Sequence, residues 1–266
     1  MRTFEEQGRS LRLMVADAGF AMSVLVHSMR RVVPDMRRRW RFVIDQLVTC
    51  GIGPLPVVCV VGLFTGMLLS LQVGMELAKV GQSESISNMI GVILFREMGP
   101  FMTAMILTAS VGSAMAAEIG TMRVSEEIDA LECMSIDPVS FLVMPRIVAM
   151  SIMTPILTLL GNVLGCLGGG IVANTQLNVA PSVYFRNLLA SLEASPQRLG
   201  PLPEEIYTVL IKAFVFGILV STISCAAGLK ASGGAIGVGR AVRVAVVRCF
   251  LMLIIIGYYI SWMFFR

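Results

Sequence analysis

Five stretches of the sequence are apolar over more than the roughly 20 residues that an α-helix needs to cross a bilayer. The chain is 56% hydrophobic and only 14% charged, with a mean hydropathy of +0.82. In soluble domains about a quarter of the residues are charged. We therefore expect an all-α membrane protein with five transmembrane helices. The expected spans lie near residues 47–78, 86–117, 140–173, 205–230 and 240–265.

The first 41 residues precede these spans and form a segment of their own. Between Leu11 and Val33 apolar side chains recur on one helical face, with Arg12, Asp17 and Arg30 elsewhere. This pattern predicts an N-terminal amphipathic helix that lies in the membrane interface. A cluster of arginines accompanies it, which is typical of the cytoplasmic side: Arg30, Arg31, Arg37, Arg38, Arg39 and Arg41.

The distribution of basic residues predicts the orientation of the chain. With the N-terminus in the cytoplasm, fifteen of the 21 Lys and Arg residues fall in cytoplasmic segments. Only four fall on the other side, namely Lys79, Arg186, Arg198 and Arg266. The positive-inside rule therefore favours a cytoplasmic N-terminus and, with five spans, a C-terminus outside the cytoplasm.

One long polar interval, residues 118–138, separates the second and third spans. It carries seven charged residues, Glu118, Arg123, Glu126, Glu127, Asp129, Glu132 and Asp137. Val124, Ile128 and Leu131 recur at helical spacing, which predicts a short amphipathic helix with Ser125 as its N-cap. Two interpretations are open: the helix is an element that a cytoplasmic partner binds, or it is an ordinary solvated loop helix.

Charged residues inside the spans are candidates for a functional site, because ionisable groups at depth are costly. Arg96 and Glu97 interrupt the second span and Lys212 the fourth. At 1.5 Å per residue, Arg96 lies about 15 Å and Lys212 about 12 Å from the outer ends of their helices. The matching depths indicate one shared polar site. The alternative is a structural salt bridge between Glu97 and Lys212.

The buried charges and a neighbouring apolar stripe together offer a cation for an anionic group and an apolar wall. Arg96 can offer a phosphate two parallel hydrogen bonds, while Lys212 acts as a point charge. Leu69, Val73 and Leu77 follow at i, i+4 and i+8 on the first span, which makes an apolar stripe suited to acyl chains.

Small residues mark close contacts between helices. Gly62 and Gly66 form one GxxxG motif, and Gly161, Gly165 and Gly169 form two in succession. Such spacing lets transmembrane helices pack backbone to backbone. Packing within one chain is the first expectation, with a dimer interface as the alternative.

Several classes of site lack their motif in this sequence. The glycine-rich stretch from Gly233 to Gly239 has no following Lys and hydroxyl, so it is not a P-loop, and we expect no ATP bound by this chain. The six cysteines are scattered singly, and His27 is the lone histidine. We assign no catalytic and no metal-binding residue. The net charge of +4 does not indicate nucleic-acid binding, because the basic residues lie mostly beside apolar runs.

Three short stretches of the sequence together resemble the signature of the MlaE family. They are AEIGTMRVSEEIDALECMSIDP at 117–138, REMGP at Arg96–Pro100 and PR at Pro145–Arg146. MlaE proteins are permeases of ABC systems that move phospholipids between the two membranes of Gram-negative bacteria, with plastid relatives. The resemblance runs from about Gly62 to the C-terminus and implies a permease domain over residues 42–266 in the bacterial inner membrane.

The resemblance also implies roles for the residues singled out above. The 118–138 segment corresponds to the coupling helix of the family, which sits in a groove of the partner ATPase. The residues implied in coupling are Glu118, Arg123, Glu126, Glu127, Ile128, Asp129, Leu131 and Glu132. Arg96, Glu97 and Lys212 match polar positions that line the lipid pocket. Many members carry an Asp in the last span where this chain has Gly257 before Tyr258, which leaves a polar contribution from this helix open.

The implied assembly is a homodimer that maintains outer-membrane lipid asymmetry. Its expected partners are two ATPase subunits that hold ATP and Mg, a small STAS-domain regulator and a hexameric MCE-domain lipid-binding protein outside the cytoplasm. The competing interpretation is a secondary transporter or channel that acts without an ATPase. That class predicts broken helices in paired halves, and the sequence shows no internal repeat. A pure scaffold is disfavoured by the charges at depth.

Overall fold

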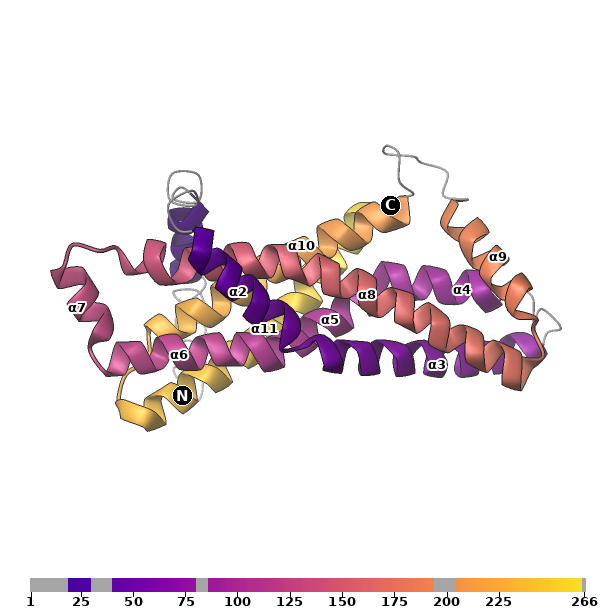
Figure 1. The fold of residues 1–266 in the computed structure, drawn as a ribbon, viewed down its shortest axis with the longest axis horizontal. Helices are drawn as coiled ribbons and strands as arrows, with labels where there is room; N and C mark the ends of the chain where they lie inside the picture. The colour runs from indigo at the N-terminus through magenta and orange to yellow at the C-terminus, as the bar shows by residue number, and fades with distance from the viewer. Residues whose placement is uncertain (1–18, 30–39, 80–85, 194–203, 265–266) are drawn as a thin grey trace, which may run out of the picture.

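The computed structural model of the chain describes residues 19–29, 40–79, 86–193 and 204–264, and the regular structure of this part is entirely helical (Figure 1). The helices are Gly19–Met29, α2 (Trp40–Ile52), α3 (Leu55–Lys79), α4 (Ile86–Ile93), η2 (Leu94–Met98), α5 (Gly99–Leu107), η3 (Thr108–Gly112), α6 (Ser113–Val124), α7 (Glu127–Cys133), η4 (Val139–Val143), α8 (Met144–Leu177), α9 (Pro181–Glu193), α10 (Glu204–Leu229) and α11 (Gly234–Phe264). The segments labelled η are π-helical.

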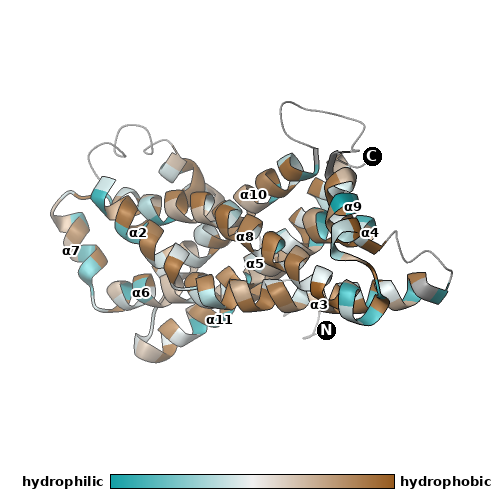
Figure 2. Ribbon diagram, turned by 45° about the vertical axis from the view of Figure 1, so that its right-hand side comes forward, coloured by the Kyte–Doolittle hydropathy of each residue, from teal (hydrophilic) through white to brown (hydrophobic). Residues whose placement is uncertain are grey.

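Five helical stretches are long and apolar enough to cross a membrane, as the sequence predicts, and they extend past several of the expected ends. They run over Trp40–Leu77, Ile86–Val124, Val139–Leu177, Glu205–Leu229 and Gly234–Phe264. Apolar segments dominate the middle of the molecule, and polar residues gather around α7 and α9 toward its two ends (Figure 2). The chain is therefore an all-helical, multi-pass membrane protein.

The first span consists of two helices that meet at a turn. Gly53 and Pro54 separate α2 from α3, and the direction of the chain changes there (Figure 1). Proline has no N–H to donate and disfavours helical geometry in the residue before it. A short apolar helix therefore leads into the long helix α3.

The predicted glycine motifs meet each other across α3 and α8. A Cβ atom on Gly66 would lie 1.8 Å from the carbonyl oxygen of Gly165, and one on Gly62 would lie 2.7 Å from that of Gly161. Only glycine allows backbones to approach this closely. Ser70 supports the contact, since its hydroxyl donates to the carbonyl of Gly169 at 2.9 Å. The expectation of packing within one chain is confirmed.

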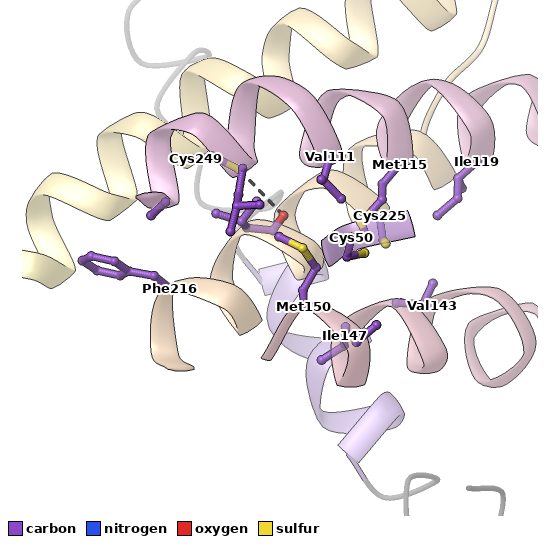
Figure 3. Close-up of a cluster of buried hydrophobic side chains, with 14 of the residues drawn as sticks. Cys50, Val111, Met115, Ile119, Val143, Ile147, Met150, Phe216, Cys225 and Cys249 are labelled. Atoms are coloured by element: carbon purple, nitrogen blue, oxygen red, sulfur yellow. Dashed lines mark hydrogen bonds between the residues drawn. The ribbon is translucent and has the colours of Figure 1, made fainter. Parts of the chain in front are cut away.

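Two apolar clusters form the core. The larger one joins helices from all five spans, and Figure 3 shows Cys50, Met115, Met150 and Cys225 gathered at its centre. The second cluster, called the outer cluster below, lies toward the α9 end and combines α4, α8, α9 and α10. Its buried members are Ile86, Ile90, Leu94, Phe95, Cys166, Ala173, Val179, Tyr184, Leu188 and Val209.

The N-terminal helix Gly19–Met29 packs against the α7 end of the molecule. Val24 is buried in the larger cluster, and His27 Nε2 lies 2.6 Å from Asp137 Oδ2. Its opposite face exposes Met22 and Met29. One packed face and one exposed apolar face are what an interfacial helix requires. The remainder of the predicted helix, residues 11–18 and 30–33, lies outside the described residues.

Candidate functional site

The second span departs from regular α-helix at the residues that carry its charges. Leu94–Met98 is a π-helix, in which the N–H of Gly99 bonds to the carbonyl of Leu94. A π segment inserts one residue into the helical turn, and such segments are frequent at functional sites. Arg96 and Glu97 both belong to it, so their side chains are set by this distortion.

The Glu97 and Lys212 side chains form an ion pair between the second and fourth spans. Lys212 Nζ lies 3.0 Å from Glu97 Oε2 and also donates to the carbonyl of Arg96 at 2.8 Å. The Lys212 side chain is 1% exposed, whereas that of Glu97 is 52% exposed. Arg96 and Lys212, whose matching depths predicted a shared polar site, are thus in contact through the Arg96 carbonyl, and the salt bridge between Glu97 and Lys212 that was the alternative is also present.

Arg96 has a different partner, which the sequence analysis did not identify. Its Nε donates to Glu205 at 2.8 and 3.0 Å, and its Nη2 completes a forked contact with the same carboxylate. The Glu205 side chain is 3% exposed and that of Arg96 is 35% exposed. Glu205 stands seven residues before Lys212, about two helical turns, so the two share a face of α10. That spacing was the signal available in the sequence.

The last span contributes Ser261. Its hydroxyl accepts a hydrogen bond from Lys212 Nζ at 2.6 Å and donates one to Glu97. The last span therefore does contribute a polar group, and that group comes from Ser261, one turn beyond Gly257 on α11. A Cβ on Gly257 would contact the ring of Phe216 at 3.2 Å, so this position is closely packed.

Together these side chains form what we call the polar network: Arg96, Glu97, Glu205, Lys212 and Ser261. It links the second, fourth and fifth spans, and its two cations and two carboxylates sum to zero formal charge. Its buried members, Glu205 and Lys212, hold in place the two members that reach the surface of the chain. The guanidinium of Arg96 is thus a partly exposed cation of fixed orientation, a type of group that binds carboxylates and phosphates.

The apolar stripe on α3 lies beside the outer cluster. Leu69 and Leu77 are partly buried and pack against that cluster, which also contains Leu94 and Phe95 of the second span. Since those two residues immediately precede Arg96, the stripe belongs to the same half of the molecule as the polar network. Contact of Leu69, Val73 and Leu77 with acyl chains stays a prediction.

The charged helix between the second and third spans is α7, which protrudes at one end of the molecule (Figure 1). The prediction that Ser125 is its N-cap is wrong. Ser125 instead ends α6, and its hydroxyl donates to the carbonyl of Thr121 at 2.9 Å. Glu126 takes the N-cap position with a φ of 62°, a left-handed conformation that turns the chain between the helices. Three acidic residues of α7 are exposed, namely Glu127, Asp129 and Glu132.

Several residues assigned to coupling have contacts within the chain. Ile128 is 2% exposed and belongs to the larger core cluster, so it fastens α7 to its own permease and is not an anchor for a partner. Glu118 lies in α6 and accepts a hydrogen bond from Arg146 at 2.9 Å. This ion pair joins α6, which precedes α7, to α8, which follows it. Arg123 pairs with Asp129 on α7 itself, and Leu131 is half-buried.

Five apolar spans, three of which share a charged network, and a polar helix that projects at one end define a multi-pass membrane protein with a polar site within its spans. Comparison with known proteins gives its family: the chain belongs to the MlaE permease family, whose model, Permease MlaE, matches residues 43–263.

Relatives cover nearly the whole chain. A probable ABC transporter permease protein of Rickettsia prowazekii is 38% identical over 84% of this chain and 83% of its own length. One from Rickettsia bellii is 34% identical over 97% of this chain and 95% of its own. The chloroplastic protein TRIGALACTOSYLDIACYLGLYCEROL 1 of Arabidopsis thaliana is 33% identical over 85% of this chain and 62% of its own. The chain is thus a permease subunit of the ABC transporter class.

Proposed function

We propose that this permease moves phospholipids between the inner and outer membranes of a bacterium, with the lipid phosphate bound at the polar network. The observation that carries the proposal is the partly exposed guanidinium of Arg96, which a buried carboxylate holds in a forked contact. A guanidinium recognises a phosphate through paired hydrogen bonds of this kind. The half-buried stripe of Leu69, Val73 and Leu77 would receive the acyl chains.

The proposal assigns a role to each member of the network. Arg96 binds the phosphate, and Glu205 fixes the plane of its guanidinium. Lys212 adds a second positive charge from behind, while Glu97 and Ser261 hold its ammonium group. Because Glu97 is half-exposed, it can turn away to admit a ligand without becoming a buried unpaired charge.

The same proposal includes the assembly. We place the N-terminus and α7 in the cytoplasm and the C-terminus in the periplasm. The exposed acidic residues of α7 would then meet basic groups of an ATPase that holds ATP and Mg. A second copy of the chain, a STAS-domain regulator and a periplasmic MCE-domain protein complete the assembly that we expect.

The experiment is to measure the phospholipid that co-purifies with the intact complex of each variant. Arg96→Glu should abolish lipid retention, and Arg96→Lys should weaken it, because a lysine cannot form the fork. Arg186→Glu, on the exposed face of α9, is the control for a general loss of positive charge and should retain lipid.

A charge swap separates binding from folding. Arg96→Glu combined with Glu205→Arg restores an ion pair but moves the guanidinium to a buried position. This variant should assemble and still lose its lipid. Native lipid content and transport in Arg96→Glu would show that these charges are only a structural pair.

A further inference from the structure

A small cavity lies between α3, the second span and α8, one turn from the polar network. Its lining is mainly apolar, with Gly62 on α3, Leu94 and Met98 on the π segment, and Asn162 on α8 among its residues. Asn162 is fully buried, and neither its amide nitrogen nor its amide oxygen makes a hydrogen bond to any part of the chain that the structure describes. An amide in this position faces a heavy desolvation penalty unless something satisfies it.

The size of the cavity identifies what can satisfy the amide. The centre of a water-sized sphere can move over about 20 Å³ inside it. A single water needs roughly 10–15 Å³ by this measure, together with polar partners. The hydroxyl-bearing residues Thr65 and Thr103 also line the space. The space can therefore hold a water, and the two hydroxyl groups and the amide supply polar partners for it.

The Asn162 amide also packs against the backbone of Gly99, at the end of the π segment. A Cβ atom on Gly99 would lie 1.8 Å from Asn162 Oδ1, so the amide of α8 sits directly against the backbone at this glycine. Gly99 is also the residue whose N–H closes the π turn onto Leu94. The position of Asn162 therefore bears on the backbone that sets the directions of Arg96 and Glu97.

We propose that Asn162 binds one ordered water molecule in this cavity, and that this hydrated amide fixes the π segment that presents Arg96 and Glu97. Asn162 is then a positioning residue for the polar network. The effect on lipid rests on the proposed function of that network, whereas the water and the contact with Gly99 do not.

The first test replaces the amide with an apolar side chain of similar branched shape. The Asn162→Leu complex should still assemble, because the substitution removes the amide and its water together and leaves no buried polar group without a partner. Its co-purifying phospholipid should fall severalfold, and Asn162→Asp, which keeps hydrogen-bonding oxygens, should restore it. Thr158→Val is the matched control on the same helix, since the Thr158 hydroxyl bonds only locally to the carbonyl of Thr154. Native lipid content in Asn162→Leu would overturn the positioning role.

The second test is independent of lipid and of the tolerance of this site for leucine. Gly99→Ala drives a methyl group into Oδ1 and should lower the apparent Tm of the complex by roughly 4 °C or more. In an Asn162→Ala background the same substitution should have little effect, because the atom it meets is gone. Equal effects of Gly99→Ala in both backgrounds would overturn the contact.

A map of the native complex that resolves ordered water provides the third measurement. Density for one water within hydrogen-bond distance of the Asn162 amide is expected. A dry cavity at that resolution would overturn the water site. If Arg96→Glu leaves lipid unchanged, the proposed function fails, yet the water density and the Gly99 experiment still decide this inference.

Discussion

The unequal burial of Glu97 and Lys212 predicts that the two halves of one ion pair are not equally important for folding. Lys212 is 1% exposed and Glu97 is 52% exposed. Glu97→Gln leaves a buried ammonium group without its carboxylate, and breaking a buried pair in this way costs about 3–5 kcal/mol. Lys212→Met leaves a carboxylate that can reach its surroundings, so the expected cost is about 1–3 kcal/mol for the lost hydrogen bonds.

The double variant sharpens this prediction. With Glu97→Gln and Lys212→Met together, no buried charge is left unpaired, and the free energy of unfolding should exceed that of Glu97→Gln alone. The coupling between the two sites should be about 2 kcal/mol, within the range for residues in contact. Lys79→Met removes the exposed pair with Glu76 and serves as the control, with an expected loss of about 0–1 kcal/mol.

The measurement is denaturant unfolding of the purified permease in mixed micelles, with co-purifying phospholipid measured in parallel. The double variant should be folded and should retain less lipid than the native complex, because the second cation, Lys212, is gone while Arg96 remains. If Glu97→Gln is no more destabilising than Lys212→Met, or if the two losses simply add, the reasoning from burial is wrong.

Three further predictions concern orientation, coupling and packing. Reporter fusions should place Arg266 outside the cytoplasm, and a cytoplasmic signal there would contradict the five-span topology. Glu127→Lys with Asp129→Lys reverses the charge of α7 and should uncouple ATP hydrolysis from transport, since like charges at an interface cost several kcal/mol; normal transport by this variant would exclude α7 as the coupling element. Gly66→Ala forces α3 away from α8 and should lower the free energy of unfolding by about 1–3 kcal/mol. Gly239→Ala is the control, because no atom lies near a Cβ at that position, and it should be neutral or stabilising. Equal effects of the two substitutions would refute the close contact.

The spans and the close helix contact could be predicted because each depends on a short stretch of the sequence. Apolar length sets a span, and the glycine spacing predicts a close contact, which the structure places between α3 and α8. The matching depths of Arg96 and Lys212 predicted that their helices share a polar site, and the pairing of Glu97 with Lys212 was one of the two interpretations left open. These inferences needed no knowledge of how the helices are arranged.

Other features depend on that arrangement and could not be read in advance. An apolar stripe does not reveal whether it faces its own core or a partner, so the burial of Ile128 was missed. The π segment at Leu94–Met98 is a shift of hydrogen-bond register that no residue type requires. The spacing of Glu205 from Lys212 indicates that the two share a face of α10, but the pairing of Glu205 with Arg96 depends on how the second span packs against α10.

The neutrality of the polar network has a consequence for turnover. The cations already hold two resident anions, the carboxylates of Glu97 and Glu205. Under the proposed function, an arriving phosphate therefore takes part in an exchange with Glu97, the half-exposed carboxylate, while the buried Glu205 keeps its contact with Arg96. The net binding free energy is then a difference between two anions, phosphate and carboxylate, so it stays small even where the individual contacts are strong. When the ligand leaves, Glu97 returns to Lys212 and no cation is left without a partner, which allows the site to release what it has bound.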